Sequence, residues 1–282
     1  KVTDELRAHL GNQVALHSYD GFPAGLDALA DKAVAVDPER AVAAIFSRLE
    51  TAGAKIVAKR DPSVLPRAMK NDTEIAGHHA AQARDGAAVS RFLHWLSNAA
   101  PQGAETELSA AARLLEFREA TGKLVDTSFD TISGASSNGA ICHYRVCEET
   151  NLPIVMDSLY LVDSGGQYLD GTTDITRTIA IGTPTAEMKR RFTQVLKGHI
   201  ALATIRFPYG TTGGQLNALA RQYLWADGVD YAHGTGHGVG SFLAVHEGPQ
   251  RIAAFGGQGE PLRPGMICSN EPGYYKAGEF GI

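Results

Sequence analysis

The sequence predicts an α+β protein, in which helices pack on one face of a curved antiparallel sheet and part of a small α/β domain precedes them. The first observation is the order of elements beyond residue 66, which is helix, helix, strands and then helix, helix, strands again. That repetition indicates an internal two-fold plan. The second is the alternation of short strand-like runs with amphipathic helices over about the first 60 residues, which is typical of parallel strand pairing.

The small N-terminal part is predicted from two apolar runs. Ala33–Val36 and Lys55–Ala58 read as strands that flank a helix from about Pro38 to Ala52. The stretch Asp61–Pro66 carries prolines that break both patterns, so a domain boundary is expected there. The predicted domains are residues 1–66, a partial α/β domain, and residues 67–282.

Helix starts in the larger domain are marked by local capping signals. Asn71–Glu74 and Thr212–Gln215 have the spacing of capping boxes. A further helix of about Glu105–Thr121 is expected to end at Gly122, and Thr183-Pro184 is expected to start another with proline at the first helical position. The helix that follows Asn71 has an apolar stripe consisting of Val89, Phe92, Leu93 and Leu96.

Strand-rich segments are predicted from about Val125 to Ile181. The expected turns lie at residues 134–138, residues 164–166 and Gly171. Asp163 and Asp174 are eleven residues apart, and a hairpin through these glycine-rich turns would place both on adjacent strands facing the same way.

Composition limits the classes of partner and the compartment. The formal net charge of −5 argues against a nucleic-acid or anionic-membrane surface. No run of about 18 apolar residues suggests a membrane span. The three cysteines have no CxxC pair or metal-finger spacing, so buried free thiols in a reducing, cytoplasmic compartment are expected.

Three distant strings together predict a dinuclear metal site. They are LVDSGGQYLDGTTDITRT (161–178), HGTGHGVGSFLAVHEGP (233–249) and SNEPGYY (269–275), with Asp163, Asp174, His237 and Glu271 as the candidate ligands. Three carboxylates and one imidazole suit Mn²⁺, Co²⁺ or Zn²⁺. Two such ions about 3.5–4 Å apart can share a water and generate hydroxide near neutral pH.

The glycines around His237 superficially resemble a dinucleotide-binding loop. Such a loop needs a preceding strand and a following helix. The sequel Ser241–Val245 favours a strand, which argues against that interpretation. We expect the glycines to allow positive φ values and close approach of a substrate to the metals. His237, as a ligand, needs a hydrogen-bond partner on its other ring nitrogen.

From about Met69 to Ile282, these strings resemble the catalytic domain of aminopeptidase P, the Xaa-Pro aminopeptidase branch of the pita-bread metallopeptidases. The string around His237 is typical of the long cytosolic type. The resemblance implies a pita-bread fold for residues 67–282, and a creatinase/prolidase-like N-terminal domain before it.

The resemblance also implies a role for each matching residue. Asp163 would hold one metal, Asp174 would bridge both, and His237 and Glu271 would hold the second. The expected ions are two divalent metals, Mn²⁺ first, with Zn²⁺ and Co²⁺ as alternatives. The residues that would contact substrate are His143, His233, His237, His246 and Tyr275. The catalytic residues would be Glu271, His143 and His246.

The implied activity is hydrolysis of the N-terminal Xaa-Pro peptide bond by a metal-activated water, with Glu271 moving the proton to the leaving proline nitrogen. The implied partners are peptides with proline at the second position and a second copy in a homodimer. An Xaa-Pro dipeptidase (prolidase) stays open as an alternative, as does an inert pita-bread binding module.

The ends of the chain also differ from the family pattern. The family has a fifth ligand, a second bridging glutamate, shortly after the Gly-Ile of GEFGI, where this sequence ends. We therefore expect an internal piece of a longer enzyme, whose catalytic domain is C-terminally incomplete.

Overall fold

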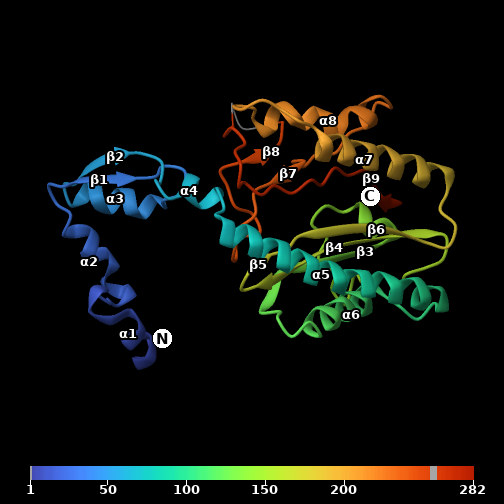
Figure 1. The fold of residues 1–282 in the computed structure, drawn as a ribbon, viewed down its shortest axis with the longest axis horizontal. Helices are drawn as coiled ribbons and strands as arrows, with labels where there is room; N and C mark the ends of the chain where they lie inside the picture. Colours follow the sequence, from blue (N-terminus) through green and yellow to red (C-terminus); the bar gives the residue numbers. More distant parts are fainter. Residues whose placement is uncertain (1, 255–258) are drawn as a thin grey trace. The chain divides into compact units, whose positions relative to one another are not determined.

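The structure is a computed structural model that describes residues 2–254 and 259–282. Contacts divide the chain into two compact units, one ending at Val64 and the other starting at Leu65 (Figure 1).

The N-terminal unit contains a parallel strand pair with a helix between the strands. β1 (Ala33–Val36) pairs in parallel with β2 (Lys55–Ala58), as predicted. The connecting helix α3 (Ala43–Thr51) starts later than Pro38, because the Asp37 carboxylate accepts hydrogen bonds from the backbone of Glu39 and Asp61 and closes a turn first. The unit also contains α1 (Asp4–Leu10), α2 (Phe22–Asp27) and the 3-10 segments Gly11–Gln13 and Tyr19–Gly21.

The predicted capping boxes start two helices of the larger unit. The Glu74 backbone N–H donates to Asn71 Oδ1 at 3.0 Å, the Asn71 N–H donates to Glu74 Oε2 at 2.9 Å, and α5 (Asp72–Ala99) follows. The Thr212 N–H donates to Gln215 Oε1 at 2.8 Å before α8 (Gly213–Trp225). Three further helical segments are α4 (Val64–Ala68), α6 (Glu107–Glu119) and the 3-10 segment Ala100–Gln102.

Two other helix ends differ in how well they agree with their predicted positions. Gly122 has a φ of 66° just after α6, as expected for a residue that ends a helix. The prediction of proline at the first position of the next helix is wrong. The Thr185 hydroxyl accepts from the Met188 N–H and caps α7 (Ala186–Thr204), so Pro184 lies ahead of the cap.

A four-stranded antiparallel sheet forms the centre of the larger unit. β4 (Ser158–Tyr168) pairs with β3 (Asp126–Ala135) on one side and β6 (Ile175–Ile181) on the other, and its far end pairs with β5 (Gly171–Thr172). A 3-10 segment, Ser136–Ala140, follows β3. The turn predicted at residues 164–166 is wrong, because these residues continue β4 and the chain reverses at residues 169–170.

The helices of the larger unit form two pairs. In Figure 1, α5 and α6 lie along the four-stranded sheet, and α7 packs against α8 in a second pair. The apolar stripe of α5 enters the core between the helices and the sheet, where Phe92 and Leu96 are fully buried beside Tyr160 and Ile181. The α+β class and the helices-on-sheet arrangement are therefore confirmed.

The second half of the larger unit repeats the order helix, helix, strands, but its strands are short. They are β7 (Gly236–His237), β8 (Arg251–Ile252), β9 (Tyr275–Lys276) and β10 (Phe280–Gly281). The strand predicted at Ser241–Val245 is wrong. Leu243 and Ala244 have φ values of 58° and 48°, and the Leu243 N–H donates to Gln167 Oε1 at 3.0 Å, so the segment is a bend held by β4.

Within residues 2–254 and 259–282, no helix is both long and apolar enough to cross a membrane. All three cysteines are free thiols, but Cys142 and Cys147 are exposed, so the prediction of burial is wrong for them. Only Cys268 is partly buried, and burial raises the pKa of its thiol to about 11.

Candidate metal centre

The first two candidate ligands lie at neighbouring positions of the sheet. Asp163 lies in β4 and pairs in register with Thr176 of β6, while Asp174 directly precedes β6. The sheet therefore brings the two aspartates together, as predicted, although the connection runs through the turn at residues 169–170. The Arg84 guanidinium pins that turn to α5 by two hydrogen bonds to Asp170, of 2.9 and 2.8 Å.

His237 is the centre of a three-residue cluster. Its Nε2 atom lies 3.3 Å from Asp174 Oδ2 and 3.0 Å from Glu271 Oε1. One donor atom from each of these three residues lies within 4.8 Å of the others, which is close enough for all three to bind one ion. The structure thus gathers residues from the position before β6, from β7 and from the segment before β9.

Asp163 lies outside this group of three but has the properties of a ligand. Its Oδ1 atom is buried and has no hydrogen-bond partner among the described residues. Burial and the neighbouring Asp174 raise the pKa of the Asp163 carboxyl to about 7, against a smaller opposite effect of a hydrogen bond to Thr176. A buried carboxylate oxygen without a partner is costly, and a bound cation would compensate it.

The protonation of His237 fits the same interpretation. Burial by itself would lower the pKa of His237, but its hydrogen bonds to Asp174 and Glu271 outweigh burial and raise it to about 10. Burial by itself would raise the pKa of Glu271, but its hydrogen bonds to His237 and Ser269 outweigh burial and lower it. Without a metal, a proton on Nε2 therefore joins the two carboxylates. A metal that binds Nε2 must displace this proton, so its affinity should fall as the pH falls.

Backbone and hydroxyl contacts fix the orientation of His237 and Glu271. His237 Nδ1 lies 2.9 Å from the Gly238 carbonyl, which supplies the expected partner for the other ring nitrogen. The Ser269 hydroxyl donates to Glu271 Oε1 at 2.6 Å and accepts from the His237 N–H at 2.9 Å. Ser269 is not among the predicted site residues, although it stands two residues before Glu271 in the string that identified the glutamate.

The glycines beside His237 are needed for close packing of the backbone. A Cβ atom on Gly236 would lie 2.1 Å from the Ser269 carbonyl oxygen, and one on Gly238 would lie 2.0 Å from the Glu247 carbonyl oxygen. The expected positive φ values are wrong, since Gly234, Gly236, Gly238 and Gly240 all have ordinary φ. The segment after His237 is not helical, so the structure also excludes a dinucleotide-binding loop.

Two of the predicted cleft histidines, His246 and His143, lie near the cluster. The His246 ring packs edge-on against the His237 ring, with 4.2 Å between the centroids. Burial and then His237 lower the pKa of His246, and His143 is near enough to contribute to the shift. His143 itself is exposed and has a φ of 56°, an uncommon backbone conformation for a histidine.

His233 and Tyr275 form a pair of their own. His233 Nε2 lies 2.8 Å from the Tyr275 hydroxyl, and His233 Nδ1 lies 2.8 Å from the Gly234 carbonyl. A carbonyl only accepts, so Nδ1 carries the ring proton and the Tyr275 hydroxyl donates to Nε2. The tyrosine proton therefore points at His233. Burial raises the pKa of Tyr275, so the phenol stays protonated.

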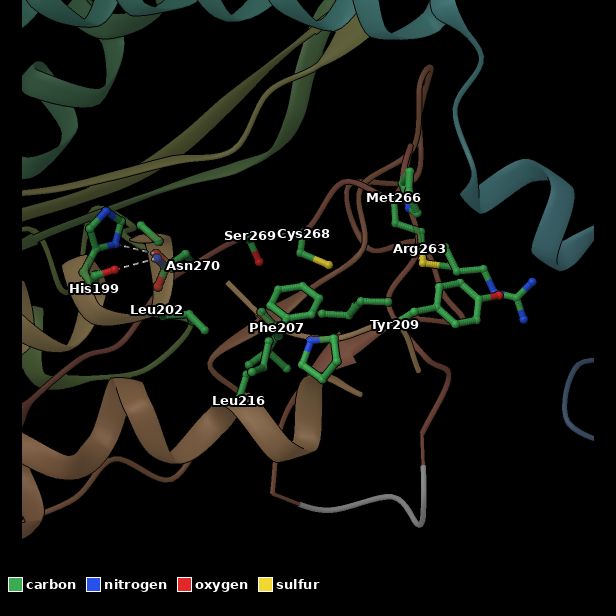
Figure 2. A pocket seen from close by; sticks show the side chains of 15 residues that line it. His199, Leu202, Phe207, Tyr209, Leu216, Arg263, Met266, Cys268, Ser269 and Asn270 are labelled. Carbon is green, nitrogen blue, oxygen red and sulfur yellow. Dashed lines mark hydrogen bonds between the residues drawn. The ribbon is translucent and has the colours of Figure 1, made fainter. Parts of the chain in front are cut away.

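A separate apolar pocket lies beside the segment that carries Glu271. It has a volume of about 770 Å³ and is lined from α7, α8 and the chain between Leu262 and Asn270. Figure 2 shows Phe207 and Leu216 facing it and two hydrogen bonds that join His199 to Asn270 at one end. None of the four predicted metal ligands lines this pocket, so it is distinct from the metal cluster.

Three carboxylates and an imidazole at the seam of an α+β domain define the class of proteins with a carboxylate-rich divalent metal centre. The model of metallopeptidase family M24 matches residues 76–282, and the model of the creatinase/prolidase N-terminal domain matches residues 1–74. The chain belongs to metallopeptidase family M24. The resemblance to aminopeptidase P is also confirmed by individual relatives.

Aminopeptidase P2 of Arabidopsis thaliana is 44% identical over 313 aligned positions, which cover 100% of this chain and 44% of that protein. The crystal structure of X-prolyl aminopeptidase from Caenorhabditis elegans, described as a cytosolic enzyme with a di-nuclear active site, is 33% identical with a TM-score of 0.89. That match covers 99% of this chain and 47% of the other. An Xaa-Pro dipeptidase from Bacillus anthracis is 26% identical with a TM-score of 0.75, over 91% of this chain and 71% of the other. This chain spans about half the length of the curated relatives it matches.

Proposed function

We propose that the protein is a metal-dependent aminopeptidase that hydrolyses the bond between an N-terminal residue and a following proline. The observation that carries the proposal is the convergence of Asp174, His237 and Glu271 within 4.8 Å, next to the unpartnered Asp163 oxygen. The likeness to aminopeptidase P2 and to X-prolyl aminopeptidase supports the choice of substrate.

The proposed ligands are Asp163, Asp174, His237 and Glu271, for two divalent ions with Mn²⁺ preferred over Zn²⁺ or Co²⁺. When bound, such ions would activate a water and polarise the peptide carbonyl. Glu271 has a lowered pKa and is ionised at neutral pH, so it can accept the proton of the water and pass it to the leaving proline nitrogen.

His143, His233 and His246 would act on the substrate rather than on the metal. The lowered pKa of His246 keeps its ring neutral near pH 7, and a neutral ring can donate one hydrogen bond to the oxygen of the scissile carbonyl. His143 would approach the same oxygen from the neighbouring loop. His233 with Tyr275, and the ring of His237, would line the cleft.

Several further properties belong to the same proposal. Residues 67–282 would form the catalytic domain, and residues 1–66 would be part of the N-terminal domain. The protein would work in the cytoplasm as a homodimer on peptides with proline at the second position. A prolidase activity is the second candidate, because a dipeptidase shares the fold at 26% identity.

The test uses the full-length protein and three substrates, namely an Xaa-Pro-Xaa tripeptide, an Xaa-Pro dipeptide and an Xaa-Ala-Xaa tripeptide. We expect release of the first residue from the Xaa-Pro-Xaa peptide, loss of this activity after chelation, and recovery with Mn²⁺. Faster cleavage of the dipeptide would favour a prolidase. Full turnover by metal-free protein, or equal rates with alanine and proline, would refute the proposal.

A further inference from the structure

A buried ion pair joins α5 to α6, the two helices that lie along the four-stranded sheet. Asp85 of α5 accepts two hydrogen bonds from Arg118 of α6, from Nε at 2.7 Å and from Nη2 at 3.1 Å. The exposed fractions of the two side chains are 0% and 1%. Burying two charges costs solvation energy that their attraction only partly returns, so such a pair is weak evidence for stability alone.

The Asp85 carboxylate also accepts one hydroxyl on each oxygen. The Tyr168 hydroxyl donates to Oδ1 at 2.8 Å, and Thr173 Oγ1 donates to Oδ2 at 2.7 Å. Tyr168 is the last residue of β4, whereas Thr173 directly precedes Asp174. Asp85 is therefore one side chain away from a proposed metal ligand, although it lies in a different layer of the domain.

Thr173 is fixed from several directions at once. Its N–H donates to the Gly166 carbonyl at 2.9 Å, and the Gly166 N–H donates to its hydroxyl at 2.8 Å. Its carbonyl accepts from Ser128 Oγ at 2.8 Å. The backbone of Thr173 also packs closely against Gly165, since a Cβ atom on Gly165 would lie 2.0 Å from the Thr173 carbonyl oxygen. The backbone that leads into Asp174 thus has little freedom left.

We propose that Asp85, acting through the Thr173 hydroxyl, is a positioning residue that holds Asp174 in place for a divalent ion. In these contacts, the Thr173 hydroxyl links the Asp85–Arg118 ion pair to the backbone that leads into Asp174. Ligands held by a locked backbone lose less conformational freedom when they bind a metal. The inference rests on the proposed metal site and adds a second layer of residues to it.

The test compares two variants, each of which removes one of the two hydroxyl groups that donate a hydrogen bond to Asp85. Thr173→Val removes the hydrogen bond next to Asp174, and Tyr168→Phe removes the matched hydrogen bond at the end of β4. Metal is stripped from the full chain by chelation, and Mn²⁺ affinity is measured by titration calorimetry. We expect T173V to bind Mn²⁺ at least tenfold more weakly than wild type, Y168F to stay within about twofold, and Thr173→Ser to restore binding.

Thermal unfolding of the metal-free proteins separates positioning from general damage. Equal losses of Mn²⁺ affinity in T173V and Y168F would overturn the inference, as would wild-type affinity in T173V. If T173V does not fold, the double variant Asp85→Leu/Arg118→Met removes the pair without leaving a lone buried charge, and wild-type affinity in that variant would overturn the inference. Failure of wild-type protein to bind any divalent ion would instead refute the proposed function itself.

Discussion

Lys70, just before α5, forms a buried ion pair with Glu247, the residue that follows His246. The exposed fractions of the two side chains are 0% and 5%. Arg67 Nε lies 3.2 Å from the other Glu247 oxygen, and the Glu247 N–H donates to the Gly238 carbonyl at 2.8 Å. The loop that carries His246 is thus tied both to the start of α5 and to the residue after His237.

Glu247→Gln should destabilise the protein strongly, because it leaves the Lys70 ammonium buried without its counter-charge. A loss of about 3–5 kcal/mol is expected from the removal of one partner of a buried pair. The measurement is urea unfolding, with Glu279→Gln as the control, since Glu279 forms an exposed ion pair with Lys276. The double variant Lys70→Met/Glu247→Leu should recover much of the loss. Equal unfolding midpoints for the two single variants would contradict this expectation.

Asp163→Asn should make the metal-free protein more stable at neutral pH while weakening metal binding. The folded-state pKa of Asp163, about 7, lies above its ordinary value of 3.8, so the folded state holds this proton more tightly than the unfolded state. The stability that this group contributes is therefore present below about pH 4 and is lost as the pH rises to about 7. The difference at pH 7 should be on the order of a few kcal/mol.

Urea unfolding in the presence of a chelator at pH 5 and pH 8 checks this sign. The wild type should lose stability relative to D163N between the two values, and added Mn²⁺ should stabilise the wild type more than D163N. Parallel pH dependences for the two proteins would show that the Asp163 carboxyl is not destabilised by folding.

Replacement of His246 should impair catalysis without loss of metal. His246 packs on His237 but is absent from the group of donor atoms that could hold an ion. We expect His246→Ala in the full-length enzyme to lower kcat/KM about 10²-fold or more, and His143→Ala to act in the same way. His79→Ala on the exposed face of α5 is the control. Metal analysis that found depleted ions in H246A would assign this histidine a structural role.

His233 and Tyr275 should behave as one unit in a double-mutant cycle. Their 2.8 Å hydrogen bond uses the tyrosine proton, so either Tyr275→Phe or His233→Ala breaks the same contact. The double variant should therefore lose less kcat/KM than the product of the two single losses, with a coupling energy of about 0.5–3 kcal/mol. Additive losses would indicate that the two side chains act on the substrate separately.

Local patterns determined much of the architecture before any tertiary contact was known. The start of α5 was predictable because Asn71 and Glu74 satisfy each other's backbone N–H groups within one turn. β1 and β2 were predictable because each is a short apolar run bounded by polar residues. The strings around Asp163, His237 and Glu271 identified the cluster because each residue stands in an unusual local context.

Features that depend on distant atoms were decided by the tertiary structure. Residues 164–166 look like a turn, yet they continue β4, because Gly165 leaves room for the Thr173 carbonyl. Ser241–Val245 has strand-forming residues, yet it bends, because Gln167 and Thr172 of the first half bond to Leu243. The long-range contacts stabilise the observed conformations by more than the local turn or strand propensity favours the predicted ones, so both segments depart from their local preference.

The sequence by itself determined which residues could carry the chemistry, and the tertiary structure decided their electrostatic state. Burial is a property of the folded domain, so only the structure shows that the pKa of Asp163 is raised and that a proton joins His237 to two carboxylates. The same holds for the pairs Asp85–Arg118 and Lys70–Glu247, whose partners are 33 and 177 residues apart. No spacing rule connects such partners, because the layers of the fold, rather than the chain between them, bring them into contact.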